Sequence, residues 1–426
     1  MSPTHYLRKT CRLCNSSEVT QVVALEPIPL SEGYMADPNA AQAAERFPVD
    51  VYMCATCGHV QQLDVIASDV LWDSYTYYSG DAKGMPEHFA TVSQRIAARV
   101  DLPQDALVVD IGSNDGSLLK PFKERGCRVL GVDPAKDVAA KANADGIPTF
   151  DTFMTANLAQ RIRKEHGPAQ VVCAFNVFAH ADDLGEMVDC VHEMLGPDGL
   201  FFFEAQYLLD IIDGVLIATI FHEHMSHHSV KPLASFLDRH GLELIAIDRA
   251  RIQHGSMIGT VQRKGAGRPV EASVHETIAL EDARALDQVT TLNAFGADVR
   301  ALRDSTAALA AQWKADGKRI AAFGAARSGP TLMAQFGLRD MIEFIVDDHP
   351  QKVGLCSSGD GVPIRPTADL TKEMPDYCVI LAWVHAEKII ETNREYLERG
   401  GRFVVLCPQT RVVAASGDVA LNAVNA

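Results

Sequence analysis

A strand, a glycine turn and a helix follow one another in the stretch ALVVDIGSNDGSLLKPF, and this pattern restricts the possible folds more than any other in the chain. The apolar run LVVDI is typical of a strand buried in a parallel sheet, and it carries Asp110 near its end. Gly112 and Gly116 let the backbone come close to a ligand where the helix begins. A second strand, CRVLGVDP, ends in Asp133, about twenty positions beyond the turn, where a carboxylate can accept hydrogen bonds from a ribose. The pattern predicts an α/β fold that binds a nucleoside.

The turn DIGSNDG, with Asn114 near its centre, lacks the third glycine of G-x-G-x-x-G, which argues against a dinucleotide. Downstream, the stretches DTFMTANLA, VVCAFNVFAHADDL and GPDGLFFFEAQYL repeat the order of elements in class I methyltransferases, which bind S-adenosylmethionine at the strand ends. In this interpretation Phe153 stacks on adenine, Asn176 meets the methionine portion, and His180 faces the opening of the site. A dinucleotide is the alternative.

The last third of the chain starts a second α/β unit. The stretch KRIAAFGAARSGPTLMAQF predicts a strand, a glycine turn and a helix, and MIEFIVDDHPQKVG predicts the next strand with an acidic end. The glycine turn either holds a phosphate-sized ligand or only joins strand to helix, and Arg327 is the residue that could grip a diphosphate oxygen. Before this unit, residues 274–313 show helical spacing, which predicts one long helix. After Arg411 we expect an irregular tail.

Two C-x-x-C pairs lie near the N-terminus: Cys11 with Cys14, and Cys54 with Cys57. Two residues between thiolates let both sulfurs point inward from one tight turn, so the two pairs together can complete a tetrahedral Zn²⁺ site. In a reducing compartment such spacing indicates a metal rather than disulfides. Four sulfur ligands close the coordination shell, so we expect a structural zinc, with a small β-rich insertion between the pairs.

Composition argues against two classes of function. A formal net charge of -16 argues against nucleic-acid binding, which needs a basic surface. The N-terminus MSPTHYLRKT lacks the apolar region of a signal peptide, and no run approaches roughly eighteen apolar residues, so we expect no membrane association and a cytoplasmic location. At 426 residues the chain needs two or three domains, and a monomer is adequate to enclose one site.

The stretch ATIFHEHMSHHSV gathers four histidines and a glutamate: His222, Glu223, His224, His227 and His228. Adjacent residues point to different sides of a regular strand or helix, so Glu223 and His224 can share a pocket only on irregular backbone. The residues alone leave three interpretations open. The stretch is a catalytic base, a surface loop, or a second metal site that uses His224 with either His228 or His222.

Tyrosines cluster in the stretch SYTYYSG. On a strand, Tyr75 and Tyr77 would share one face and Tyr78 would point to the other. The cluster is either an apolar patch of the core or a pair of phenols that lines a substrate cleft.

Taken together, the double C-x-x-C, SYTYYSG, VDIGSNDGSLL, FHEH, FGAARSG, VDDHPQKVG and LAWVHAEKI resemble the zinc-containing sugar C-methyltransferases, which methylate ketonic nucleotide-linked deoxysugars. The motifs follow in the same order over almost the whole chain. The resemblance implies a zinc-binding domain in residues 1–66 and a class I methyltransferase domain in residues 67–268. Residues 269–416 would form a linker helix and a Rossmann-like domain that holds the nucleotide sugar.

The resemblance also implies an active site. The family pattern Tyr-His-Glu-His matches Phe221, His222, Glu223 and His224, with phenylalanine in place of the tyrosine. It makes Glu223 and His224 the catalytic pair, with Phe221 and His222 beside the substrate.

Further residues follow from the same resemblance. His180 and one of Tyr75 or Tyr77 would line the sugar pocket, and Arg327 and Trp383 would contact the nucleotide sugar. The implied ligands are S-adenosylmethionine, a structural zinc and a dTDP- or GDP-linked keto-deoxysugar.

Methylation of carbon needs a carbanion equivalent, which a carbon beside a ketone can supply when a base removes its proton. Histidine suits this role because its reference pKa of about 6.5 leaves it neutral at cytoplasmic pH. The hypothesis is that His224 is the base, that Glu223 orients the imidazole or stabilises its charged form, and that His180 or a tyrosine hydrogen-bonds the oxyanion. The alternatives are methylation of another carbon, nitrogen or oxygen, and a catalytically silent binding protein.

Overall fold

A computed structural model describes residues 4–72, 77–82, 84–407 and 409–419. Packing divides the chain into two compact units whose segments alternate along the sequence. The first unit takes Met1–Thr20, Met53–Leu209 and Met225–Val289, and the second takes Gln21–Tyr52, Asp210–His224 and Thr290–Ala426. The division passes through the histidine-rich stretch, between His224 and Met225. The domain limits expected near residues 66 and 268 stay a prediction.

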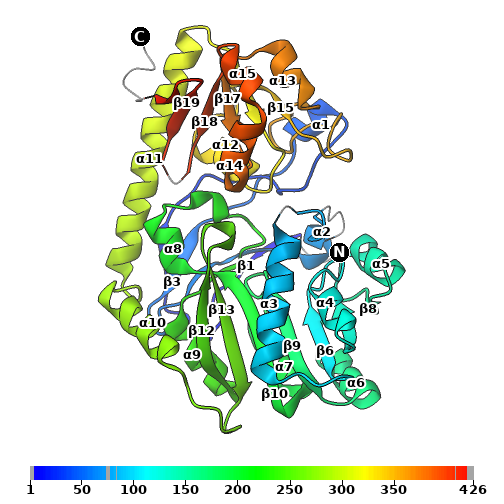
Figure 1. Ribbon diagram of the computed structural model, residues 1–426. Helices are drawn as coiled ribbons and strands as arrows, with labels where there is room; N and C mark the ends of the chain where they lie inside the picture. Colours follow the sequence, from blue (N-terminus) through cyan, green and yellow to red (C-terminus); the bar gives the residue numbers. More distant parts are fainter. Residues whose placement is uncertain (1–3, 73–76, 83, 408, 420–426) are drawn as a thin grey trace. The chain divides into compact units, whose positions relative to one another are not determined.

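The first unit is built on a seven-stranded sheet with the order β12-β13-β10-β9-β6-β7-β8 (Figure 1). Its strands are β6 (Leu107–Ile111), β7 (Arg128–Val132), β8 (Thr149–Phe150), β9 (Ala169–Phe175), β10 (Leu195–Gln206), β12 (Leu242–Ala250) and β13 (Ser256–Arg263). Neighbours from β8 to β10 are parallel, whereas β13 is antiparallel to both β10 and β12. The predicted class I methyltransferase fold and its final antiparallel pair are confirmed.

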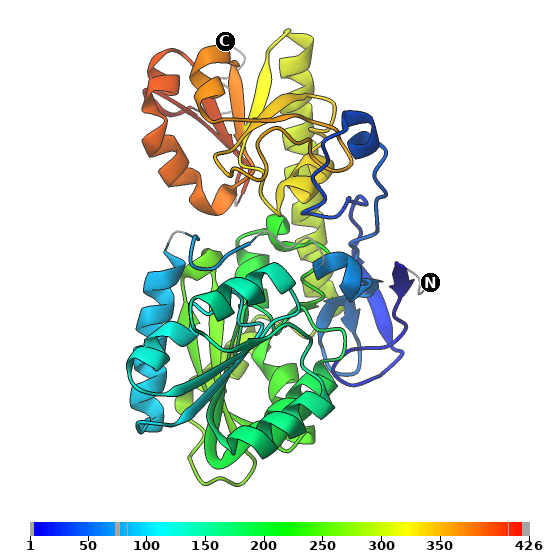
Figure 2. The ribbon, with the colours of Figure 1, turned by 90° about the vertical axis from the view of Figure 1, so that its right-hand side faces the viewer.

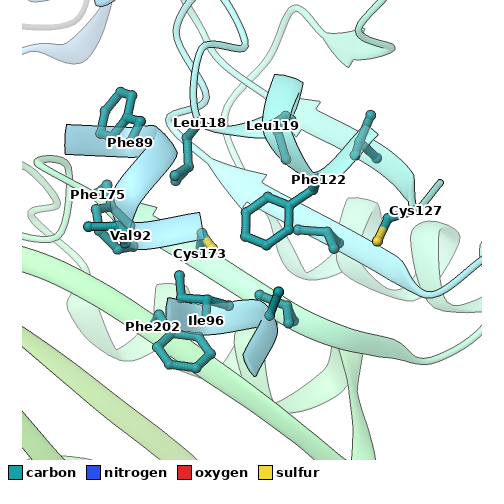
Figure 3. Packing of buried hydrophobic residues seen from close by; sticks show 14 of the residues in the cluster. Phe89, Val92, Ile96, Leu118, Leu119, Phe122, Cys127, Cys173, Phe175 and Phe202 are labelled. Atoms are coloured by element: carbon teal, nitrogen blue, oxygen red, sulfur yellow. The ribbon is translucent and has the colours of Figure 1, made fainter. Parts of the chain in front are cut away.

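Helices of this unit pack against that sheet. They are α3 (Met85–Val100), α4 (Leu119–Glu124), α5 (Lys136–Ala144), α6 (Ala156–His166), α7 (Leu184–Met194), α9 (Val230–Arg239) and α10 (Ala272–Ala283). Apolar residues of α3 recur at helical spacing and pack on side chains of β9 and β10, and the view in Figure 2 shows α3 beside the sheet. Figure 3 shows this core, where Phe89 and Val92 of α3 meet Phe175 and Phe202.

Short elements surround the cysteine pairs. They are β1 (His5–Leu7), β2 (Val19–Val23), α1 (Pro38–Gln42), β3 (Val51–Cys54), β4 (Val60–Gln62), β5 (Asp64–Ile66) and α2 (Ser68–Trp72). β1 pairs with β5, and a second small sheet has the order β11-β4-β3-β2, in which β11 is Ser226–His227. The expected insertion between the pairs therefore contains strands, but it also contains α1.

The second unit has its own seven-stranded sheet with the order β16-β15-β14-β17-β18-β19-β20. Its strands are β14 (Ile320–Phe323), β15 (Ile342–Val346), β16 (Ile364–Arg365), β17 (Tyr377–Ile380), β18 (Arg402–Val405), β19 (Arg411–Ala414) and β20 (Gly417–Val419). The helical elements are η1 (Ile217–Thr219), α11 (Val289–Ala315), α12 (Gly329–Gln335), α13 (Ala368–Glu373), η3 (Trp383–His385), α14 (Ala386–Thr392) and α15 (Arg394–Glu398), and α8 (Leu208–Asp213) leads into this unit. The predicted second Rossmann-like sheet is confirmed.

Two sequence expectations are wrong. The single helix over residues 274–313 is two helices, α10 and α11, because Ala285 takes a left-handed φ of 48° and Leu286 turns inward to become buried. The tail is not irregular as far as it is described, to Val419, since β19 pairs antiparallel with β18 and then with β20. The consecutive residues Val412 and Val413 of β19 are both buried.

Within the described part of the chain, every helix is too short or too polar to cross a bilayer. The longest, α11, carries charged residues along its length.

The glycine turn after β6 requires its glycine for two separate reasons. Gly112 has a φ of 71°, and a Cβ at this position would lie 2.7 Å from Val177 Cγ2. Gly265 has a similar φ of 81°, but nothing lies within 4 Å of where its Cβ would be.

We therefore expect Gly112→Ala to lower the free energy of unfolding more than Gly265→Ala. Both substitutions place an L-residue at positive φ, which costs about 1–2 kcal/mol, but only the first also forces Val177 to move. Urea unfolding of the two variants beside the parent chain measures the difference. Equal losses of unfolding free energy in the two variants would show that Val177 can move aside at no cost.

Candidate active site

The four cysteines converge in the first unit. Cys11 Sγ lies 3.6 Å from Cys57 Sγ, and Cys14 Sγ lies 3.5 Å from Cys54 Sγ, with all four sulfurs within 4.8 Å of one another. This spacing fits four thiolates around one tetrahedral Zn²⁺. Nearby His59 instead places Nε2 3.2 Å from Ser226 Oγ. Among the residues that the structure describes, this is the one group of three or more side chains suited to a metal, so the histidine-based metal interpretation finds no support.

The carboxyl ends of β6 and β7 carry the predicted cofactor residues. Asp133 accepts a hydrogen bond from the backbone N–H of Asn114 at 2.8 Å and another from that of Ala135 at 2.9 Å. Asp110 Oδ1 is buried and has no hydrogen-bond partner among the described residues. Burial, reinforced by Asp133, raises the pKa of Asp110 to about 8. An unpartnered buried oxygen at this strand end fits a donor supplied by a bound ligand.

The side chains of the glycine turn hold the end of the tyrosine segment. Asn114 Oδ1 accepts from Ser79 N at 2.8 Å, and Asn114 Nδ2 donates to Tyr77 O at 3.0 Å. Asp115 Oδ2 accepts from Gly80 N at 2.9 Å. The predicted cofactor residue Asn114 therefore also anchors the segment that follows Tyr75, which itself lies outside the described residues.

Other predicted cofactor residues lie at neighbouring strand ends. Gly116, at a φ of 78°, follows the turn, and Asn176, at a φ of 56°, follows β9 and donates its backbone N–H to Glu204 O at 2.9 Å. Phe153 is 43% exposed, which leaves its ring accessible for stacking. Their contacts with a cofactor stay predictions.

His180 stands in the loop after β9. Its ring stacks on Trp72 of α2, with centroids 5.7 Å apart and planes at 27°, and its backbone N–H donates to Val177 O at 2.9 Å.

In the second unit, Glu223 belongs to a buried charge network. Its Oε2 accepts a hydrogen bond from Arg327 Nη1, and Arg327 Nε lies 3.4 Å from Glu32 Oε1. Lys352 Nζ lies 3.7 Å from the other Glu32 oxygen, over the ring of Tyr34. Burial raises the pKa of Glu223, and Arg327 opposes that effect.

His224 is oriented by backbone. Its Nδ1 donates to Thr219 O at 2.6 Å, which assigns the lone pair of the neutral ring to Nε2. Burial, opposed by the hydrogen bond to Thr219 and helped by the charge of Arg327, lowers the pKa of His224 to about 4. Thr219 thus orients the ring through Nδ1, and the Glu223 carboxylate is bonded by Arg327, so the role of Glu223 towards His224 stays a prediction.

The other substrate residues of this unit are buried. Phe221 packs its ring 4.0 Å from the His224 ring, and His222 places Nε2 3.3 Å from Phe47 O. Trp383, at the carboxyl end of β17, is 5% exposed. Their roles toward a substrate stay predictions.

His227 and His228 belong to the first unit and form part of its core. β11 pairs His227 with Val60 of β4. The ring of His228 stacks 5.6 Å from His59 and 5.2 Å from Phe178, and burial lowers its pKa to about 4. The surface-loop interpretation of the stretch is therefore wrong.

Several polar residues of these sites carry no motif in the sequence. Glu32 and Tyr34 come from the segment between the cysteine pairs, and only their folded positions bring them to Arg327 and Lys352. In the first unit, Glu204 at the end of β10 is fully buried and binds His88 Nε2 at 2.9 Å. A glutamate inside the apolar run FFFEAQ is the one local signal.

We expect one zinc per purified chain, lost in Cys54→Ser and retained in His224→Gln and His228→Phe. Three remaining thiolates hold the metal much less tightly, and neither histidine contributes a ligand. Metal analysis of the four proteins checks this. A second equivalent that disappears with either histidine would restore the second-site interpretation.

We also expect His228→Phe to flatten the pH dependence of stability. The unfolded chain protonates this ring near pH 6.5, but the folded chain does so only near pH 4. The neutral ring therefore contributes stability that is full above about pH 6.5 and declines as the pH falls towards 4.

Urea midpoints at about pH 7.5 and about pH 5 test this expectation, with the exposed His275→Gln as control. Phenylalanine keeps the stacking on Phe178. If the difference between the two midpoints is the same in His228→Phe as in the parent chain, His228 is not the source of the pH dependence.

Three family profiles match the chain in succession. A profile described as "Putative zinc binding domain" matches residues 11–72, "Methyltransferase domain" matches residues 82–247, and "C-methyltransferase C-terminal domain" matches residues 251–408.

The chain is also similar to individual proteins. The C-methyltransferase NovU of Streptomyces niveus is 34% identical over 406 residues, which cover 95% of this chain and 97% of NovU. The mitochondrial ubiquinone biosynthesis O-methyltransferase of Bos taurus is 26% identical over 152 residues, which cover 32% of this chain and 41% of that protein. The solved structure of magnesium protoporphyrin IX methyltransferase from Synechocystis with bound SAH is 18% identical, covers 42% of this chain and 84% of that chain, and gives a TM-score of 0.33. Since the similarity to NovU spans nearly the full length of both chains, this protein belongs to the zinc-binding, S-adenosylmethionine-dependent C-methyltransferases.

Proposed function

We propose that the chain methylates the carbon beside the ketone of a nucleotide-linked keto-deoxysugar, with His224 as the base. The observation that carries the proposal is the hydrogen bond from His224 Nδ1 to Thr219 O, together with the low pKa of the ring. The imidazole is neutral at cytoplasmic pH and its lone pair is on Nε2, which is what proton abstraction requires.

The low pKa also defines what the rest of the site must contribute. A base with a pKa of about 4 has little driving force for removing a proton from carbon. Most of the lowering of the barrier must then come from positioning and from stabilisation of the enolate oxygen. His180 is the residue proposed for that oxyanion, with the phenol of Tyr75 or Tyr77 as the alternative donor, and Phe221 has no hydroxyl to donate.

S-adenosylmethionine, when bound, supplies an electrophilic methyl group. The residues proposed to hold it are Asp110 and Asp133, with Phe153 against the adenine. Each oxygen of Asp133 accepts one backbone N–H and keeps a second lone pair for a ribose hydroxyl. Asp110 keeps Oδ1 for a donor, and binding that donor would favour the ionised carboxylate.

The second unit supports the proposal that the substrate carries a nucleotide. Its turn at Gly324, with a φ of 91°, follows β14 as Gly112 follows β6. Asp347 ends β15 as Asp133 ends β7, and it accepts hydrogen bonds from Ala325 N and His349 N, both at 2.7 Å. The chain thus has two turns of the same kind, and S-adenosylmethionine is proposed to bind at the one in the first unit.

Arg327 is proposed to hold Glu223 in its ionised form. Its guanidinium is bonded to Glu223 through Nη1 and lies beside Glu32 through Nε. A fixed anion at Glu223 would stabilise a positive charge that forms on the neighbouring imidazole.

The test is incubation with methyl-labelled S-adenosylmethionine and a panel of dTDP- and GDP-linked 4-keto-6-deoxysugars. We expect one sugar to gain one methyl group on carbon, which NMR of the product locates. Label on oxygen or nitrogen would support the other methyltransferase activities. No transfer to any sugar, with S-adenosylmethionine still bound, would reject the proposal.

With that sugar, His224→Gln should lower kcat by at least about a thousandfold while S-adenosylmethionine affinity stays within about twofold, because the amide cannot take a proton.

In the parent chain, kcat/KM should show no loss as the pH falls through about 6.5, since His224 stays neutral until near pH 4. Two results would remove His224 as the base. One is a loss of kcat/KM near pH 6.5 that persists in every variant, and the other is near-normal turnover by His224→Gln.

A further inference from the structure

Asp182 contacts three side chains of the zinc-binding segment, by which we mean residues 4–20 and 53–72 of the first unit, around the four cysteines. Tyr6 OH donates to its Oδ2 at 2.5 Å, and Arg8 Nη1 donates to its Oδ1 at 3.1 Å and to its backbone oxygen at 3.0 Å. Arg12 Nη2 lies 3.1 Å from the same Oδ1. All four residues belong to the first unit.

Arg12 is part of the zinc knuckle itself, between Cys11 and Cys14. Its side chain is fully buried, and its Nη1 donates to Gln61 Oε1 at 3.2 Å. A buried guanidinium that lost its carboxylate partner would be left incompletely paired, so Arg12 and Asp182 are held together strongly. Zinc, when bound, would fix the cysteines on either side of Arg12.

Asp182 stands two residues after His180, in the loop that follows β9. The ring of His180 is stacked on Trp72, and α2, which ends at Trp72, begins just after β5. β5 in turn pairs with β1, where Tyr6 lies opposite Val65. The zinc-binding segment therefore contacts the ring of His180 at one place and its loop at another.

We propose that Asp182 is a positioning residue, through which the zinc-binding segment fixes His180 for methyl transfer. The inference rests on the proposed role of His180 at the enolate oxygen. It assigns the zinc-binding segment a part in the reaction beyond its own folding, with the closed cysteine site acting through Arg12 and Asp182.

Relative magnitudes distinguish this role from that of an ordinary ion pair. The Asp182 side chain is 25% exposed, and its pair with the partly exposed Arg8 contributes little to stability, whereas the fully buried Arg12 would lose a charged partner. Displacement of a catalytic group by about 1 Å can reduce turnover about a hundredfold. Loss of Asp182 should therefore lower turnover even in chains that stay folded and keep their zinc, although it also lowers stability.

The test compares Asp182→Ala and Asp182→Asn with Asp145→Ala, which removes an exposed ion pair to Lys141 in the same unit. We expect Asp182→Ala to lower kcat at least about tenfold, with one zinc per chain and S-adenosylmethionine affinity within about twofold of the parent. Asp182→Asn should lie between, since its amide oxygen still accepts from Tyr6 or Arg8. Asp145→Ala should match the parent.

A second readout needs no turnover. The fluorescence of Trp72, obtained by subtracting the spectrum of Trp72→Phe, reports the stacked His180, and protonation of His180 should quench it as the pH falls. We expect Asp182→Ala to weaken this quenching and His180→Ala to abolish it. Arg8→Met combined with Asp182→Ala should add little to either effect, because both remove the same contact.

Unchanged kcat and unchanged Trp72 quenching in Asp182→Ala would overturn the inference. So would loss of zinc, or loss of S-adenosylmethionine binding in parallel with kcat, because Asp182 would then support the fold rather than the loop. If the parent chain methylates no sugar of the panel, the proposed function fails, but the Trp72 signal still decides whether Asp182 holds His180.

Discussion

A carboxylate that binds backbone N–H groups fixes the glycine turn in both α/β units, and the proposed sites are built around these turns. Asp133 and Asp347 each follow the second strand of a unit, and each accepts one N–H from the turn and one from the residue two positions after itself. The turn N–H groups are directed at the acid, so the polypeptide leaves the strand at positive φ and only glycine fits. An acid that sequence patterns assign to a ribose thus also has a structural role that precedes ligand binding.

Burial determines the state of the histidines in the same way. His224 and His228 each have a pKa near 4, yet their neighbours differ in kind. His228 is stacked between aromatic rings of the first unit, where a neutral imidazole serves as a flat, moderately polar core residue. His224 is held by a backbone carbonyl next to a charge network, where the same neutrality leaves a lone pair suited to chemistry. Equal pKa values therefore accompany a packing role at one position and a proposed catalytic role at the other.

The sequence predicts features whose chemistry is local. Two C-x-x-C turns present thiolates whatever surrounds them, and the strand, glycine turn and helix around Gly112 follow one another in a short stretch. The zinc site, both Rossmann-like sheets and the family therefore followed from the sequence. The break at Ala285 did not, because alanine has high helix propensity and only the burial of Leu286 forces the turn. The partners of the histidine-rich stretch could not be predicted either. Glu32 reaches Arg327 across almost three hundred positions, and no spacing rule relates them.

The phenylalanine at position 221 shows how one substitution changes what the other residues must do. Its ring lies 4.0 Å from that of His224 and adds apolar surface, which favours the neutral imidazole. A tyrosine there could donate a hydrogen bond to a developing oxyanion, and phenylalanine cannot. A donor to an oxyanion is effective only when it is held rigidly before the charge develops. For His180, the donor that we propose in the first unit, the contacts of Tyr6, Arg8 and Arg12 with Asp182 are proposed to supply such rigidity.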